Sequence, residues 1–261
     1  MLVELAAAAD SNLATHFTWV HRHTPEMRVH DAVGLTLADS GLSCDTFNCA
    51  CRARLDPRTA RQELKNAIAW FAGRPFSWWV GPADRPSDLG DLLRSEGFER
   101  TEMAVAMMVD LSAVEPDQSS PNGLTVRRVQ TPSELAAFAE IAAANWSPPD
   151  PLVCRFYELA APTLLSSSSP LRLYLGWVDG SPVATSELTL AGGVGGVYNV
   201  ATSAPHRRRG FGSAMTLRPL LDARREGCRY AVLQAAAAGL GVYRRLGFEP
   251  FGDVSEYALV G

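Results

Sequence analysis

A short sequence pattern occurs twice in this chain, about 150 residues apart. Residues 94–99 read Arg-Ser-Glu-Gly-Phe-Glu, and residues 244–249 read Arg-Arg-Leu-Gly-Phe-Glu. Phe47-Asn48 and Tyr198-Asn199 form a second matched pair at nearly the same offset. Self-similarity at a fixed offset indicates a repeated structural unit. The sequence therefore predicts two related copies, which restricts the fold more strongly than any single motif does.

The segments between these anchors have the same order of predicted elements in both halves: strand, helix, strand and short helix. In the first half these elements are expected at residues 46–55, 57–70, 76–81 and 87–95. In the second half they are expected at residues 197–202, 210–226, 229–235 and 242–246. Strands that alternate with helices indicate an α/β fold, with a mixed central sheet flanked by helices.

The clearest break in the chain is residues 115–123, a polar segment with two prolines that ends in Asn-Gly. We predict a first domain over 1–115, a linker over 116–122 and a second domain over 123–261. The second domain contains further predicted elements before its repeated part: a strand, two helices and two antiparallel strands. These are expected at residues 124–129, 131–146, 151–165, 171–178 and 183–190.

Composition excludes several classes of protein. The formal net charge of -4 argues against a dedicated nucleic-acid-binding protein. Five cysteines are an odd and sparse set, which favours free thiols over a disulfide framework, and Cys49-x-Cys51 lacks a second pair at zinc-site spacing. No apolar run approaches 18 residues, and an acidic residue, Glu4, stands where a signal peptide carries bases. We therefore expect a cytoplasmic protein without a metal or membrane partner.

Arg207-x-x-Gly210-x-Gly212 lies between a predicted strand and a predicted helix. A helix start presents unpaired N–H groups and a partial positive charge, which suits a phosphate group. Glycines allow the backbone to approach a diphosphate closely, and the arginines add charge. The pattern matches neither the nucleotide-binding G-x-x-x-x-G-K-[ST] nor the dinucleotide-binding G-x-G-x-x-G. A solvated basic helix start is the alternative explanation.

A second segment makes the interpretation specific. Val242-Tyr243-Arg244-Arg245-Leu246-Gly247-Phe248 begins 35 residues after Arg207. Together the two segments resemble the acetyl-coenzyme A signature of the GNAT acetyltransferase superfamily, over essentially all of 123–261. The first half resembles the C-terminal portion of that fold, truncated, and its segment Pro57–Leu64 has no glycine where the cofactor loop stands in the second half. The resemblance therefore implies a tandem GNAT protein with a degenerate first copy.

The resemblance implies a direct transfer of an acetyl group from acetyl-coenzyme A to a primary amine of a small molecule or peptide. It places the thioester beside residues 200–202, where two strands splay apart and expose backbone groups, and the diphosphate at the loop. The expected cofactor-binding residues are Val200, Ala201, Thr202, Arg207, Arg208, Arg209, Gly210, Phe211, Gly212 and Ser213. No metal is implied.

Tyr243 falls at the family's position for the general acid that protonates the leaving thiolate. Phenol and thiol pKa values of about 10 and 8.5 make this transfer uphill by about 2 kcal/mol, which is a small cost. Glu187 is the nearest acid for taking a proton from the amine. The alternatives are that Tyr243 only packs on its short helix and that Glu187 is a solvated strand residue.

The chain departs from the family pattern at two positions. Ala236 occupies the place of a frequent asparagine, and the strand 197–202 contains Asn199 but no acid. Because a general base is not evident, a non-catalytic acyl-coenzyme A-binding regulatory or scaffold protein remains the alternative function. The oligomeric state and the identity of the acceptor are left open by the sequence.

Overall fold

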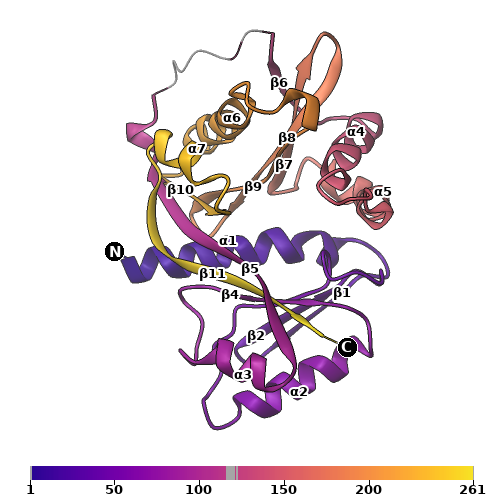
Figure 1. Ribbon diagram of the computed structural model, residues 1–261, viewed down its shortest axis with the longest axis vertical. Helices are drawn as coiled ribbons and strands as arrows, with labels where there is room; N and C mark the ends of the chain where they lie inside the picture. Colours follow the sequence, from indigo (N-terminus) through magenta and orange to yellow (C-terminus); the bar gives the residue numbers. More distant parts are fainter. Residues whose placement is uncertain (1, 116–120, 122, 261) are drawn as a thin grey trace. The chain divides into compact units, whose positions relative to one another are not determined.

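The computed structural model of the chain describes residues 2–115, 121 and 123–260 (Figure 1). The described residues fall into two compact units, Met1–Ala106 with Phe251–Gly261, and Met107–Pro250. The expected linker, residues 116–122, lies outside the described residues apart from Pro121. The described strands form one 11-stranded mixed sheet, and each unit contains a part of it with helices on both faces, so the predicted α/β class with a mixed, helix-flanked sheet is confirmed.

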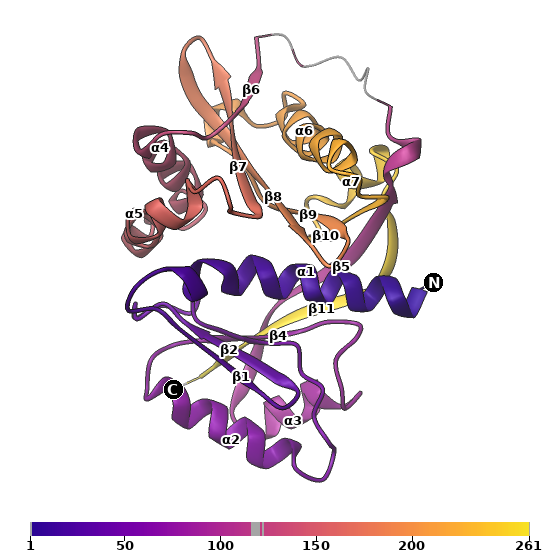
Figure 2. The same ribbon diagram turned by 180° about the vertical axis from the view of Figure 1, so that it is seen from behind.

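The first unit has the strand order β1-β2-β3-β4-β11-β5. Its β3 and β4 are parallel, whereas β1-β2, β2-β3 and β4-β11 are antiparallel. Helix α1 covers one face of the sheet, and α2 and α3 cover the other (Figures 1 and 2). The elements are α1 (Leu2–His23), β1 (Arg28–Ala32), β2 (Leu35–Asp39), β3 (Cys49–Cys51), α2 (Ala60–Phe71), β4 (Ser77–Val80), α3 (Leu89–Ser95), β5 (Phe98–Asp110) and β11 (Glu249–Leu259).

The second unit has the strand order β5-β10-β9-β8-β7-β6. Its β9 and β10 are parallel, and β6-β7, β7-β8 and β8-β9 are antiparallel. Helices α4 and α5 lie on one face, and α6 and α7 on the other (Figure 2). The elements are β6 (Thr125–Arg128), α4 (Pro132–Ala143), α5 (Pro151–Leu164), β7 (Leu171–Val178), β8 (Ser181–Ala191), β9 (Val194–Thr202), α6 (Phe211–Arg225), β10 (Tyr230–Ala235) and α7 (Leu240–Arg245), with 3-10 turns at Leu111–Ala113 and Ala204–His206.

The two copies follow the same path. The first runs β1-β2-β3-α2-β4-α3-β5, and the second runs β7-β8-β9-α6-β10-α7-β11. Before this shared part the first copy has one helix, α1, whereas the second has β6, α4 and α5. The first copy is therefore the shorter one, as the sequence predicts.

The last strand of each copy passes into the other compact unit. Within the first unit β11 pairs with β4, for example Tyr257 with Trp78. Within the second unit the end of β5 leads to Leu111, whose N–H donates to the carbonyl of Arg229 just before β10, at 2.8 Å. The compact units therefore do not coincide with the consecutive segments 1–115 and 123–261, because β11 is the last strand of the second copy but packs in the first unit.

The predicted elements differ from the structure mainly in the first copy. The strand expected over 46–55 is only three residues long, and the sequence analysis did not predict α1, the β1-β2 hairpin or the long strands β5 and β11. In α2, the buried residues Ala60, Leu64, Ala67 and Phe71 recur every three to four positions, as an amphipathic helix requires. They join Trp78, Phe98 and Tyr257 in the core of the first unit.

Strand β8 is the most deeply buried strand of the second unit. All residues from Val183 to Thr189 are buried, including the polar Thr185, Ser186, Glu187 and Thr189. Buried polar groups require hydrogen-bond partners inside the protein. This strand therefore places an acidic side chain, Glu187, within the sheet that carries the predicted site.

Candidate active site

The loop before α6 has the backbone geometry of an anion-binding turn. Arg208 and Gly210 both adopt left-handed conformations, with φ of 63° and 81°. Successive N–H groups in such a turn converge on one concave surface, where they can bind an anion. A residue other than glycine in the left-handed conformation costs free energy. The backbone at Arg208 is therefore strained, and this strain lies next to the candidate site.

The amide groups of this turn are open. In the described structure, the N–H groups of residues 208–213 donate to no backbone carbonyl, and the first such bond of the helix is Ala214 N–H to Gly210 O at 3.3 Å. A Cβ atom added at Gly212 would meet no atom within 4 Å. The helix start therefore combines unpaired donors with open space in front of a glycine, which is the arrangement that a diphosphate requires.

The arginine side chains of the loop are exposed, but two of them have partners within the loop. Arg207 Nε donates to the carbonyl of Thr202 at 3.0 Å, and the guanidinium of Arg209 lies 5.0 Å above the ring of Phe211. Phe211 itself is buried, so it offers a ligand only its backbone N–H. The loop therefore supplies positive charge and amide donors, and the core anchors its geometry.

The pairing between strands β9 and β10 ends before β9 reaches the loop that precedes α6. Their parallel pairing joins Gly195 to Ala231 and Gly196 to Val232, and the described residues 197–202 have no partner on β10. On the opposite side β9 stays paired with β8, where Ala201 faces Thr185 and Thr202 faces Ala184. The described pairing between β9 and β10 therefore ends at Gly196, before residues 200–202, where the sequence analysis expects the strands to splay apart.

Glu187 is not the solvated strand residue considered as an alternative. Its exposed fraction is 2%. Oε1 accepts a hydrogen bond from Thr189 Oγ1 at 2.7 Å, and Oε2 accepts one from Asn199 Nδ2 at 2.9 Å. Such bonds stabilise the ionised form of a carboxylate and can compensate for part of the cost of burying it.

Asn199 and Tyr157 complete a polar network around this carboxylate. Asn199 Nδ2 lies 3.4 Å from the hydroxyl oxygen of Tyr157, which comes from α5. Burial, together with the negative charge of Glu187, raises the pKa of Tyr157 well above its ordinary value, so Tyr157 stays a neutral phenol. Asn199 has a φ of 52° at a register shift between β8 and β9, and Thr185 Oγ1 donates to its carbonyl at 2.8 Å.

Tyr243 lies on α7. Its ring packs over Gly239, where an added Cβ would come within 2.8 Å of Cε2, and it meets Phe248 edge-on with ring centroids 5.9 Å apart. Burial raises the pKa of Tyr243. The phenol is therefore protonated at neutral pH, as a general acid must be. Because its pKa is raised, proton transfer from Tyr243 to a thiolate costs more free energy than it would from an ordinary tyrosine.

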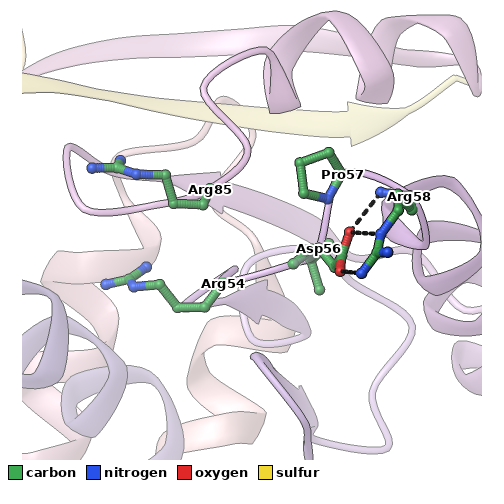
Figure 3. Close-up of a pocket in the computed structure, with 6 residues that line it drawn as sticks. Arg54, Asp56, Pro57, Arg58 and Arg85 are labelled. Carbon is green, nitrogen blue, oxygen red and sulfur yellow. Dashed lines mark hydrogen bonds and ion pairs between the residues drawn. The ribbon is translucent and has the colours of Figure 1, made fainter.

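The corresponding helix start of the first copy is already occupied by the chain itself. The carbonyl of Asp56 accepts from the N–H groups of Thr59 and Ala60, both at 2.9 Å, and its carboxylate accepts from Arg58 N at 2.9 Å and Nη2 at 2.6 Å. Figure 3 shows this pair beside Pro57. A cavity of about 690 Å³ adjoins it, lined by Arg54, Leu55, Asp56, Pro57, Arg58 and Arg85. The first copy thus lacks the open amides of the second.

Sequence reasoning did not identify the whole network around Glu187. The sequence analysis named Asn199 as an anchor of the repeat and as the polar residue of the strand 197–202, and it did not name Tyr157. Their meeting depends on the bulge between β8 and β9 and on the packing of α5, neither of which leaves a local sequence signal.

Three further features of the described residues concern disulfides, metal-ligand clusters and membrane-spanning helices. The five cysteines are free thiols. In the described part of the chain, no three His, Cys, Asp or Glu side chains gather as metal ligands, and no helix is both long and apolar enough to cross a membrane.

Comparisons with known proteins agree with this geometry. Residues 187–251 match the family model of the acetyltransferase (GNAT) domain. No curated protein shows a significant match to the chain. The segment matched by the family model holds Glu187, Asn199, the loop and Tyr243, so the candidate site lies within the part of the chain that is similar to the GNAT acetyltransferase domain.

Solved structures show the same fold over the whole chain. A GCN5-related N-acetyltransferase from Kribbella flavida is 23% identical, with 100% of this chain and 96% of that chain covered and a TM-score of 0.75. A tandem GNAT protein from the clavulanic acid biosynthesis pathway is 15% identical, covering 98% and 94% of the chains with a TM-score of 0.62. The GNAT fold in tandem form is therefore confirmed.

Proposed function

We propose that this chain is an N-acetyltransferase that moves an acetyl group from acetyl-coenzyme A to a primary amine. The observation that supports this most strongly is the run of unpaired N–H groups at residues 208–213, directly after the splayed edge of β9. Amide donors at a helix start bind a diphosphate, and a free strand edge pairs with the amides of a pantetheine arm.

The proposed reaction is an attack of the neutral amine on the thioester carbonyl. The carboxylate of Glu187 takes one proton from the amine, directly or through water, and backbone N–H groups near Val200 and Ala201 stabilise the developing oxyanion. When the C–S bond breaks, Tyr243 gives its phenolic proton to the departing thiolate. The products are the N-acetylated amine and coenzyme A, so atoms and charges balance.

The proposal includes one acetyl-coenzyme A site per chain. The second copy offers open amides at Gly210, Phe211, Gly212 and Ser213, whereas Asp56 already uses those at the start of α2. The proposed binding site also includes the three arginines of the loop and three residues at the edge of β9. These are Arg207, Arg208 and Arg209, and Val200, Ala201 and Thr202.

Calorimetry with acetyl-coenzyme A, followed by release of free thiol with a panel of primary amines, tests this function. We expect a stoichiometry of one per chain and thiol release that depends on the amine. Two sites, or no binding, would contradict the proposed site. Binding of one acetyl-coenzyme A without transfer to any amine would instead support a non-catalytic acyl-coenzyme A-binding protein.

A further inference from the structure

Asn199 differs from its counterpart in the other copy. Asn48 is fully buried, and all its amide bonds serve the fold: Oδ1 accepts from Ser40 N and Oγ, and Nδ2 donates to the carbonyls of Leu42 and Pro75. Asn199 is exposed, and its Nδ2 instead faces a carboxylate and a phenol. The same residue type therefore has a structural role in one copy and different partners in the other.

The network runs from the surface to a buried charge. Glu187 is almost fully buried, and Asn199, which is exposed, donates to its Oε2. Thr189 holds the other carboxylate oxygen, so the two donors fix the orientation of the group. Tyr157 is the titratable side chain that faces Glu187 from α5, and it stays neutral.

The backbone at Asn199 links this network to the reaction centre. Asn199 has a left-handed φ of 52°, and its carbonyl is held by Thr185 at the register shift between β8 and β9. Its neighbour along the chain is Val200, the first residue of the proposed oxyanion-binding edge. One bulge therefore sets both the direction of the Asn199 side chain and the start of that edge.

We infer that Asn199 is a positioning residue for Glu187: it orients the carboxylate beside the splayed edge of β9, where the amine gives up its proton. Tyr157 supports Asn199 by accepting its second N–H. This inference rests on the proposed function, and it adds residues that act through Glu187 and do not themselves touch the reacting atoms.

The test compares Asn199→Ala with the wild-type protein over pH 5.5–9. A hydrogen bond to a charged group contributes about 10- to 100-fold to an equilibrium constant. The variant lacks a hydrogen bond that favours the charged carboxylate, so we expect a loss of kcat/KM that grows toward the acid end of this range, reaches at most about 10- to 100-fold, and is smaller at pH 9. The KM for acetyl-coenzyme A should not change. Asn199→Asp should cause a larger loss, because it places a second negative charge beside Glu187.

A matched control exists in the first unit. Asn66 is an exposed asparagine whose Nδ2 lies 3.3 Å from a glutamate, Glu63 Oε2. Asn66→Ala removes an equivalent Asn–Glu contact outside the proposed site and should leave the pH profile unchanged. An unchanged profile in Asn199→Ala, with only a uniform decrease in kcat at all pH values, would overturn the inference and assign Asn199 a structural role.

A second measurement does not depend on knowing the acceptor. The side-chain carboxyl carbon of Glu187, labelled with ¹³C and assigned by its loss in Glu187→Gln, reports protonation by NMR. Its titration midpoint should rise in Asn199→Ala and stay fixed in Asn66→Ala. An unmoved midpoint overturns the inference even where transfer is observed, whereas a shifted midpoint in a protein that acetylates no amine contradicts the proposed function alone.

Discussion

Gly212→Ala separates ligand binding from folding at the proposed diphosphate site. Gly212 is the second residue of α6, its φ is not in the left-handed region, and a Cβ there would contact no atom within 4 Å. The substitution therefore meets no steric obstacle inside the protein. Replacing a helical glycine by alanine stabilises a helix by up to about 1 kcal/mol, which corresponds to a Tm increase of about 2–4 °C for a chain of this size.

The effect on acetyl-coenzyme A binding should have the opposite sign. The new methyl group occupies open space at the first turn of α6, and we expect it to keep a diphosphate farther from the N–H groups of residues 208–213. A charged hydrogen bond is worth about 1.5–3 kcal/mol. Losing one such bond raises the Kd of acetyl-coenzyme A by about 10- to 100-fold.

Calorimetry gives the Kd, and thermal unfolding without ligand gives the stability. Gly241→Ala in α7 is the control, because a Cβ at Gly241 would lie 3.6 Å from the guanidinium of Arg245, an ordinary contact. It should bring a similar gain in stability without a change in Kd. Wild-type affinity in Gly212→Ala would refute the diphosphate site, and a large loss of stability would refute the open space in front of Gly212.

Three further predictions test other parts of the molecule. Tyr243→Phe should lower kcat while the Kd of acetyl-coenzyme A stays the same, because the hydroxyl acts only when the thiolate leaves; an unchanged kcat removes Tyr243 from the mechanism. Burial lowers the pKa of His21 to about 4, against about 6.5 in an unfolded chain, so the unfolded state binds the proton first and stability should fall as the pH decreases from 6.5 to 4. Urea unfolding of His21→Gln should show a weaker fall over this range, and an equal fall would rule out His21 as its source. Tyr257→Ala should destabilise the first unit by about 3–5 kcal/mol. Hydrogen exchange should then show lost protection in α2 and β4 and retained protection in β8 and α6, because Tyr257 packs with Trp78; loss confined to β8 and α6 would contradict this packing.

The sequence predicted the second copy well, because its signals are local. Thr131 and Glu134 form the capping box that starts α4, and β7 has the predicted limits Leu171–Val178. The helix after the glycine loop begins at Phe211, one residue from its predicted start. Each of these features depends on caps, turns and alternation within a few residues, which a sequence displays directly.

The first copy and the final strands were harder to predict, because their structure depends on distant partners. Strand β3 is only Cys49–Cys51, and it is buried between β2 and β4. Strand β11 pairs with β4, more than 170 residues earlier in the chain. Alternation of side chains identifies a strand but does not specify which neighbouring strand it pairs with or which compact unit it joins. The boundary of the compact units therefore could not be read from the polar segment at 115–123.

The proposed difference between the copies arises from how each satisfies the backbone at an equivalent helix start. Buried or partly buried N–H groups require an acceptor, from the protein, from water or from a ligand. At α2 the chain supplies that acceptor as Asp56, and the start of the helix has no glycine turn. At α6 the loop has the left-handed residues Arg208 and Gly210, and no backbone carbonyl of the described chain accepts from the N–H groups of residues 208–213. A duplicated fold can therefore keep a proposed ligand site in one copy and lose it in the other without a change in topology, because the backbone carbonyl and the carboxylate of Asp56 already accept from the N–H groups of residues 58–60.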